Sequence, residues 1–507
     1  MPWSPRSCLW YNERMIRPSR ARFLRAERPE PLAVALPLPE ADAFELHGRI
    51  AAPGRPSFLL ESGKGSGPIA RYSFLGSDPY LVLTGKDDRY EVRRHDEPTR
   101  HKGDPFDALA SLLRASRMPR PEGLPPFFGG AVGYLSYDLI RRFEHLPERA
   151  RDDLAAPDLS FGFYDLVAAL DHRERTLHVM FAPPLGRLLG EPREKLYREG
   201  CDRLAEFEAR LTAPRPAFVP ATAPTPLTIE PDQSREAYMD RVRQCQEFIR
   251  AGDIYQANLS HRFTMGLSPA DGSPPRESAS SLYARLRLVN PSPFSALLLF
   301  EDLCLVGCSP ERLVRLEGRR VDTRPIAGTR PRGRSLPEDR RLAEELLTNE
   351  KERAEHLMLL DLERNDLGRV CRYGTVRVDE FMVLERYSHV SHIVSNVTGA
   401  LRDGLDGFDL IRAVFPGGTI TGVPKIRCME IIEELEPVRR GPYTGSLGYL
   451  GWSGDLDLNI VIRTLVLAGS RGSLQVGAGI VADSDPAREY DETLYKAEAL
   501  LKALRES

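Results

Sequence analysis

Short runs of apolar residues, bounded by turn-forming residues, recur along the chain. Runs of this length and composition are typical of β-strands. In the N-terminal half they predict strands in SFLLES at 57–62, RYSFLG at 71–76, YLVLTG at 80–85, DLVAALD at 165–171 and TLHVMFA at 176–182. In the C-terminal half they predict strands in SALLLFEDLCLVG at 295–307, YTGSLGYLGW at 443–452, LDLNIVIRTLVLAG at 456–469 and SLQVGAGIV at 473–481.

Helical periodicity separates these runs. EKLYREGCDRLAEFEARL at 194–211 is amphipathic, and the segment 234–253 starts with Ser234 as N-cap and has Gly252 near its C-cap. Two further helices are predicted at 351–366 and 488–501. This mixture predicts an α+β fold in which large, mainly antiparallel sheets are more favourable than βαβ units.

A proline-rich stretch, APRPAFVPATAPTPLTIEPDQ at 213–233, lacks helical periodicity and predicts an extended linker. It divides an N-terminal domain at 31–212 from a C-terminal domain at 234–507. Residues 1–30 are Arg-rich without the apolar segment of a signal peptide. We interpret them as a variable or disordered tail.

Composition narrows the class of protein. The 507 residues are 41% hydrophobic and 28% charged, which is typical of a globular chain. The net charge of -3 gives no basic excess for nucleic acid, and no apolar run reaches the ~18 residues of a membrane span. The seven cysteines are scattered and complete no zinc pattern, so reduced thiols and a cytoplasmic location are expected.

Two pairs of carboxylates stand at helical spacing. Glu352 and Glu355 are three residues apart, as are Glu489 and Glu492, and Lys496 follows four residues later. Such spacing puts side chains on one helix face. Either helix alone is more often a solvated charged surface, but two pairs meeting across a site would supply oxygen ligands for Mg²⁺.

Small-residue turns occur in PIAGTRPRG, FPGGTITGVPK and QVGAGIV. Glycines allow backbone N–H groups to approach an anion, although each turn alone is a weak signal. None completes a Walker loop or a dinucleotide fingerprint.

Together these segments resemble the chorismate-utilising enzymes, a family that includes anthranilate synthase component I, aminodeoxychorismate synthase component I, isochorismate synthases and salicylate synthases. The resemblance covers about residues 235–505, and FLLES and GGAVGYLSYDL extend it less specifically into the N-terminal half. It implies an α/β sandwich of two packed sheets flanked by helices. The motifs that carry it are GDIYQANLSHRF, NPSPF, CSPERLV, TRPIAGTRPRG, KERAEHLMLLDLERNDLGRV, ERYSHVSHIVS, FPGGTITGVPKIRCMEIIEELEP, GPYTGSLGYLGW, NIVIRT, GAGIVADSDP and DETLYKA.

The resemblance implies a Mg²⁺ cofactor and a chorismate site. Glu355 and Glu492 match direct metal ligands, and Glu352 and Glu489 match residues that hold its waters. Tyr449 and Arg463 match the pair that grips the enolpyruvyl carboxylate. Further substrate contacts are implied at Gly328, Thr329, Gly477, Ala478, Gly479 and Lys496.

Glu311 matches the general acid that protonates the leaving hydroxyl, a role that needs a raised pKa. Without the family context, an ion pair between Glu311 and the adjacent Arg312 would be the simpler interpretation. His392 and Thr419 match residues that shape the same site, and for His392 an orienting role is as plausible as proton transfer.

Gln256 distinguishes the nucleophile. Family members that use water resemble one another in having Lys at this position as a general base. A neutral amide cannot deprotonate water, whereas ammonia needs no base. Gln256 therefore favours amination over the isochorismate or salicylate synthase reactions. A non-catalytic chorismate-binding protein is the other alternative, but it would be expected to have lost Glu311 or a metal carboxylate, and this chain keeps them all. The chain lacks a G-x-C-x-G elbow, so a separate glutaminase subunit is expected to supply ammonia.

The sequence features disagree on which ring carbon the ammonia attacks. Many aminodeoxychorismate synthases carry Lys where this chain has Ala327, which matches the anthranilate synthases. YQANLS, SPERL with Arg312, PGGTITG and Asn459 resemble the aminodeoxychorismate synthases instead, and NPSPF is not followed by the Met common in tryptophan-regulated enzymes. These features favour amination at C4, giving 4-amino-4-deoxychorismate for p-aminobenzoate and folate synthesis. The alternative is anthranilate plus pyruvate for tryptophan synthesis.

FLLES matches part of the family's tryptophan pocket. It implies a possible amino-acid effector site, and an ordinary strand followed by a turn is an equally good interpretation. The residues implied are Leu60, Glu61, Ser62, Pro291 and Ser292.

Overall fold

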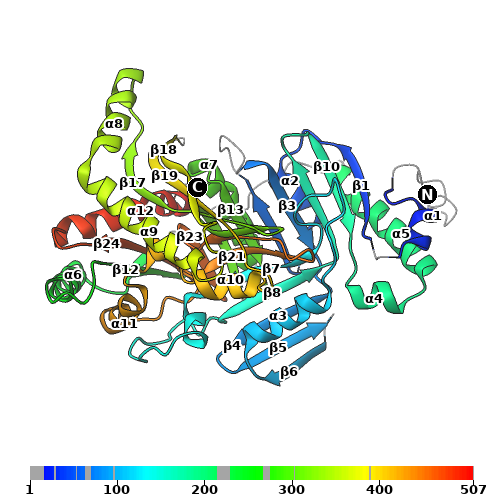
Figure 1. The fold of residues 1–507 in the computed structure, drawn as a ribbon, viewed down its shortest axis with the longest axis horizontal. Coiled ribbons are helices and arrows are strands. Elements are labelled where there is room, and N and C mark those ends of the chain that lie inside the picture. The colour runs from blue at the N-terminus through cyan, green and yellow to red at the C-terminus, as the bar shows by residue number, and fades with distance from the viewer. Residues whose placement is uncertain are drawn as a thin grey trace.

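The structure is a computed structural model that describes residues 16–27, 30–52, 54–62, 70–94, 97–213, 229–266, 275–301, 303–386 and 390–505. Two twelve-stranded sheets of antiparallel strand pairs are flanked by helices (Figure 1). The predicted α+β sandwich is confirmed. Among the described residues, no helix is both long enough and apolar enough to cross a membrane.

The first sheet joins the strands nearest the N-terminus to those nearest the C-terminus. In spatial order its strands are β1 (Leu32–Pro37), β10 (Thr176–Phe181), β9 (Leu166–Asp171), β3 (Tyr72–Ser77), β2 (Ser57–Glu61), β13 (Phe294–Leu299), β14 (Cys304–Ser309), β23 (Thr464–Ala468), β24 (Arg471–Ile480), β12 (Gln256–Gly266) and β11 (Ile229–Pro231), and β20 (Gly422–Val423) pairs with β12.

The second sheet also contains strands from both halves of the chain. Its order is β17 (Ile326–Pro331), β19 (Val390–Ala400), β16 (Arg320–Arg324), β15 (Arg312–Glu317), β22 (Leu456–Ile460), β21 (Ser446–Gly451), β7 (Gly130–Leu135), β8 (Leu159–Tyr164), β4 (Leu81–Lys86), β5 (Arg89–Arg94) and β6 (Glu97–Lys102), and β18 (Arg377–Arg386) pairs with β19.

The helices lie at the two ends and over the sheets. Figure 1 shows α1, α4 and α5 at one end of the molecule and α6, α8 and α11 at the other. Their bounds are α1 (Arg20–Arg25), α2 (Ala43–Ile50), α3 (Pro105–Ala115), η3 (Tyr137–Arg142), α4 (Leu185–Gly190), α5 (Arg193–Thr212), α6 (Arg235–Arg250), α7 (Pro275–Val289), α8 (Leu336–Thr348), α9 (Glu350–Gly368), α10 (Gly407–Val414), η4 (Gly418–Ile420), α11 (Lys425–Leu435) and α12 (Pro486–Arg505).

Both halves of the chain build the same two sheets. In the first sheet β2 pairs with β13, so that Leu59 lies opposite Leu297. In the second sheet β7 pairs with β21, so that Gly133 lies opposite Gly448. A single cluster of buried hydrophobic side chains contains residues of both sheets and both halves. The segments before and after 213–233 therefore share one core.

Two segments differ from the sequence-based expectation. Part of the predicted tail is ordered: α1 packs on α5, with the rings of Phe23 and Tyr197 5.6 Å apart and Arg20 bonded to Glu194 at 2.9 Å. Of the predicted linker, residues 214–228 lie outside the described residues, and the end of the stretch forms β11. Pairing with β12, which periodicity does not reveal, makes this end a strand.

Candidate functional site

Two neighbouring strands of the first sheet, β12 and β24, carry the centre of the predicted site. Gln256 and Asn258 are two residues apart on β12, so they point to one face of the strand. A Cβ atom on Gly479 would come within 2.4 Å of the Gln256 Nε2 atom, and one on Gly477 within 2.5 Å of the Asn258 Oδ1 atom. Glycine at both positions is therefore what lets the two amides lie across β24.

Side chains of α9 and α12 lie beside these two strands. Glu355 accepts a hydrogen bond of 3.0 Å from Gln256 Nε2. On α12, Lys496 pairs with Glu492 at 2.8 Å and donates to the Gly477 carbonyl at 3.0 Å. The predicted metal-binding helices thus flank β24.

Shared neighbours show that the two carboxylate pairs approach each other. The positive charges of Lys351 and Lys496 act on both Glu355 and Glu489. Burial raises the pKa of Glu355, and the adjacent charge of Glu352 raises it further. Burial likewise raises the pKa of Glu489. Carboxylates held together in this way favour a cation between them.

Mg²⁺ fits this donor set. Among the described residues, no three His, Cys, Asp or Glu side chains come close enough to hold a metal ion by themselves. Mg²⁺ does not need such a cluster, because it keeps several waters and takes one or two protein carboxylates together with oxygens of the substrate. Glu355 and Glu492, on different helices, can supply those two carboxylates.

Glu311, between β14 and β15, is almost fully buried. Its carboxyl accepts a hydrogen bond from the Ile326 backbone N–H and lies beside the Thr419 hydroxyl. Burial raises the pKa of Glu311 to about 8. Arg312 does not neutralise it, because the Arg312 guanidinium donates two hydrogen bonds of 2.9 Å to Asp457. Glu311 therefore carries a proton at neutral pH, as a general acid must.

A second buried acid, Glu363, acts on Glu311 and was not singled out from the sequence. Its carboxyl accepts hydrogen bonds from the Thr323 hydroxyl at 3.1 Å and from the Gly418 backbone. Burial raises the pKa of Glu363, and the charge of Asp366 raises it further. A signal was available, since Glu363 follows Glu355 by eight residues, about two turns on the same face of α9.

The pairing of β17 with β19 places the predicted histidine. Thr329 lies opposite His392, and the Thr329 hydroxyl is 2.9 Å from His392 Nδ1. Burial lowers the pKa of His392 to about 3, and the charge of Arg463 contributes. Because Arg463 also acts on Glu311, these side chains share one environment. The His392 ring is neutral at physiological pH, which fits an orienting role.

The structure places Tyr449 away from the glycine face of β24. Its ring packs against Phe74 and Phe127, with centroids 5.4 and 4.8 Å away. The predicted substrate contact of Tyr449 does not fit this position. Tyr443, six residues earlier, lies at the glycine face instead, because its hydroxyl is 2.9 Å from where a Cβ of Gly477 would be. The two tyrosines stand in one motif, so spacing alone did not separate them.

Tyr449 lines a separate cavity of about 920 Å³. Pro291 and Ser292, predicted for an effector site, are not among its lining residues; Pro293, the next residue, is. The other three predicted effector residues do line it: Leu60, Glu61 and Ser62.

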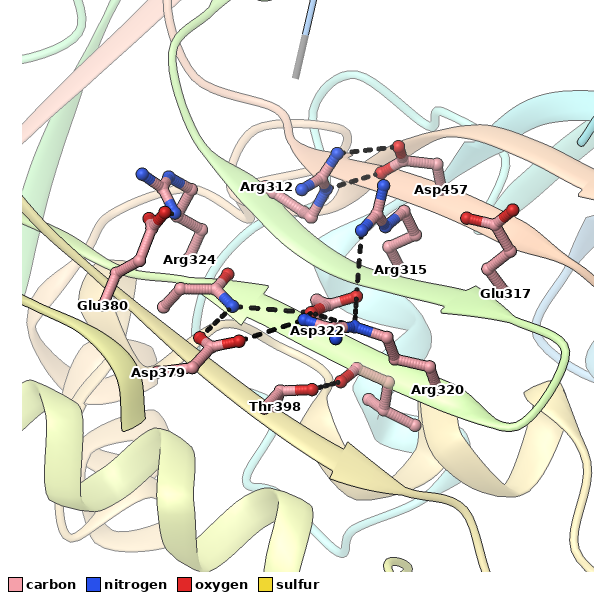
Figure 2. A network of polar contacts seen from close by, with 12 residues as sticks. Arg312, Arg315, Glu317, Arg320, Asp322, Arg324, Asp379, Glu380, Thr398 and Asp457 are labelled. Carbon is pink, nitrogen blue, oxygen red and sulfur yellow. Dashed lines mark hydrogen bonds and ion pairs between the residues drawn. The ribbon is translucent and has the colours of Figure 1, made fainter. Parts of the chain in front are cut away.

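Ion pairs continue from this cavity across the second sheet (Figure 2). Arg312 and Arg315 line the cavity, and Arg315 donates to Asp322 at 3.0 Å. Asp322 also accepts from Arg320 at 2.8 Å. Asn459 lines the cavity too. Two of the positions that favoured one amination reaction from sequence, Arg312 and Asn459, therefore belong to this cavity.

Comparisons with known proteins show which family the chain belongs to. Residues 55–502 match the model of a family described as chorismate binding enzyme. The chain is 47% identical over 489 residues to anthranilate synthase component 1 of Thermus thermophilus, covering 96% of this chain and 98% of the relative. It is 43% identical over 482 residues to aminodeoxychorismate synthase component 1 of Bacillus subtilis, covering 94% and 97%.

A solved structure shares the fold. Anthranilate synthase component I from Streptococcus pneumoniae superposes with a TM-score of 0.73 at 34% identity, covering 86% of this chain and 93% of that one. The family match spans most of the chain, and both relatives are aligned over nearly their full length. The chain therefore belongs to the family of chorismate-binding enzymes.

Proposed function

We propose that this protein aminates chorismate, with ammonia as the nucleophile and Mg²⁺ as cofactor. The observation that carries the proposal is Gln256. Its amide donates to Glu355 at the centre of the site, and it offers no basic nitrogen to activate water. Ammonia is already nucleophilic, so a site with an amide here supports amination rather than hydration.

The carboxylates of α9 and α12 would hold the metal. Glu355 and Glu492 are the proposed ligands, and Glu352 and Glu489 the proposed partners of its waters. When bound, Mg²⁺ would supply charge for the ring carboxylate of chorismate and polarise the ring. Lys496, Arg463 and the backbone N–H groups of β24 and β17 would fix the substrate by charge-assisted hydrogen bonds.

Glu311 is the proposed acid. As the bond between the ammonia nitrogen and the chorismate ring forms, the bond between C4 and its oxygen breaks. The proton of Glu311 passes to the departing hydroxyl to give water. The incoming nitrogen then gives up one proton, which restores Glu311. The raised pKa from burial keeps the acid loaded before the reaction. The neutral His392 orients Thr329 and takes no proton in this account.

For the product we propose 4-amino-4-deoxychorismate. Among the sequence features that favour it, Asn258 of YQANLS lies within the site itself. Anthranilate is the second candidate, supported by Ala327 on β17 and by the relatives named anthranilate synthase component 1. Component 1 in the names of both relatives supports a separate glutaminase subunit as the source of ammonia.

The 920 Å³ cavity is the proposed site of an amino-acid effector. Glu61 at its wall accepts a hydrogen bond from the Tyr283 hydroxyl at 2.8 Å and pairs with Arg287. Phe74, Tyr72 and Tyr449 add aromatic surface. An amphipathic ligand with an apolar side chain suits such a wall.

The test of the product is direct. The purified protein is incubated with chorismate, Mg²⁺ and an ammonium salt at raised pH, and products are separated before and after addition of an aminodeoxychorismate lyase. We expect p-aminobenzoate only after the lyase is added. Anthranilate with pyruvate before that addition would support the second candidate.

A further inference from the structure

The strongest unexplained feature of the site is a pair of buried amide oxygens. Within the described part of the chain, Gln256 Oε1 and Asn258 Oδ1 have no hydrogen-bond partner, and their residues are only 3% and 9% exposed. A buried acceptor left unpaired costs free energy that a folded protein normally avoids. Two such oxygens, carried by residues two positions apart on β12, indicate a ligand with N–H or O–H donors.

The orientation of the Gln256 amide is fixed by its own hydrogen bond. Its Nε2 atom donates to Glu355 Oε1 at 3.0 Å, so the Oε1 atom faces away from that carboxylate. Both amides lie over the glycine face of β24, where a Cβ on Gly477 or Gly479 would collide with them. The oxygens therefore lie next to the positions proposed to bind the substrate.

The backbone of Asn258 is held by hydrogen bonds at both its N–H and its carbonyl. Its backbone N–H donates to Thr421 at 3.0 Å, and its carbonyl accepts from Arg440 Nη2 at 2.6 Å. Arg440 is itself buried and paired with Glu436 at 2.7 Å. The backbone beneath the Asn258 amide is thus anchored by a buried ion pair, which limits how far the side chain can move.

We infer that Gln256 Oε1 and Asn258 Oδ1 form the seat of the attacking ammonia. Two N–H groups of ammonia would donate to the two oxygens, which leaves the nitrogen lone pair directed away from them, toward the ring. Neither amide can take a proton, so water in the same seat would stay un-ionised and unreactive. The inference rests on the proposed amination and assigns Asn258 a positioning role in it.

The test compares Asn258→Ala with Asn258→Asp. The alanine variant loses one acceptor, and we expect its KM for un-ionised ammonia to rise about 10-fold, while its KM for chorismate changes less than about 2-fold. The aspartate variant keeps an acceptor of the same shape and should stay within about 3-fold of the original protein for both substrates. If the alanine variant does not fold, Asn258→Ser, whose hydroxyl is too short for the seat, takes its place with the same expectation.

Asn396→Ala is the matched control. Asn396 is also a buried asparagine, but it donates to Asp379 at 2.7 Å in the second sheet, so its loss should leave the KM for ammonia unchanged. An unchanged KM for ammonia in Asn258→Ala, or an equal rise in Asn258→Asp, would overturn the inference while leaving amination intact. If the original protein forms no aminated product, the proposed function fails and the inference fails with it.

Discussion

At the scale of single residues, the environment of Glu311 decides whether it can act as an acid. Its neighbours are the Ile326 N–H, the Thr419 hydroxyl and the buried Glu363, and its sequence neighbour Arg312 is engaged elsewhere. Burial outweighs the hydrogen bonds, and the pKa rises to about 8. The carboxyl is thus protonated below that pH and loses its proton above it.

This gives a prediction for the pH dependence of turnover. At a fixed concentration of un-ionised ammonia, kcat/KM for chorismate should fall as pH rises through about 8, because Glu311 loses the proton that it must donate. Glu311→Gln should lower kcat by about 10²- to 10⁴-fold. Steady-state rates between pH 6.5 and 9.5 measure both effects, and near-normal turnover of the variant would exclude Glu311 as the acid.

At the scale of elements, α9 and α12 carry the two carboxylate pairs of the proposed metal site. We predict that Glu492→Gln abolishes turnover at saturating Mg²⁺, because a neutral amide oxygen is a much poorer ligand for a hard cation. The increase in melting temperature on adding Mg²⁺ should also be lost.

Glu498→Gln is the control on the same helix. Glu498 is exposed and six residues further along α12, so its variant should keep both turnover and the response to Mg²⁺. Near-normal activity of Glu492→Gln would show that the metal is bound elsewhere.

The sequence predicted helices and strands better than it predicted which of them lie next to one another. Strands such as β2, β3, β9 and β10 could be predicted because an apolar run between turn residues is a local signal. The spacing of Glu352 with Glu355 likewise follows from one helix. Glu363 beside Glu311 depends instead on contacts between segments far apart in sequence. Tyr443 lies in the turn before β21 and Tyr449 lies on β21 itself, and the sequence motif does not show which of the two reaches the site.

At the scale of the whole molecule, the shared sheets bear on stability. Because β2 pairs with β13 and β7 with β21, each sheet contains strands from before and after residues 214–228. We predict a single cooperative unfolding transition by calorimetry, and no folded state for residues 16–213 expressed alone. Two separate transitions, or a folded fragment, would show that the halves are independent domains.

Isotopic labelling tests most directly whether ammonia, and not water, attacks chorismate. The purified protein is given chorismate, Mg²⁺ and ¹⁵N-ammonium in H₂¹⁸O, and the products are analysed by mass spectrometry. We predict a product that carries one ¹⁵N and no ¹⁸O, because Gln256 supplies no base for water. Isochorismate or salicylate as the main product, with ¹⁸O incorporated into the isochorismate, would contradict the account.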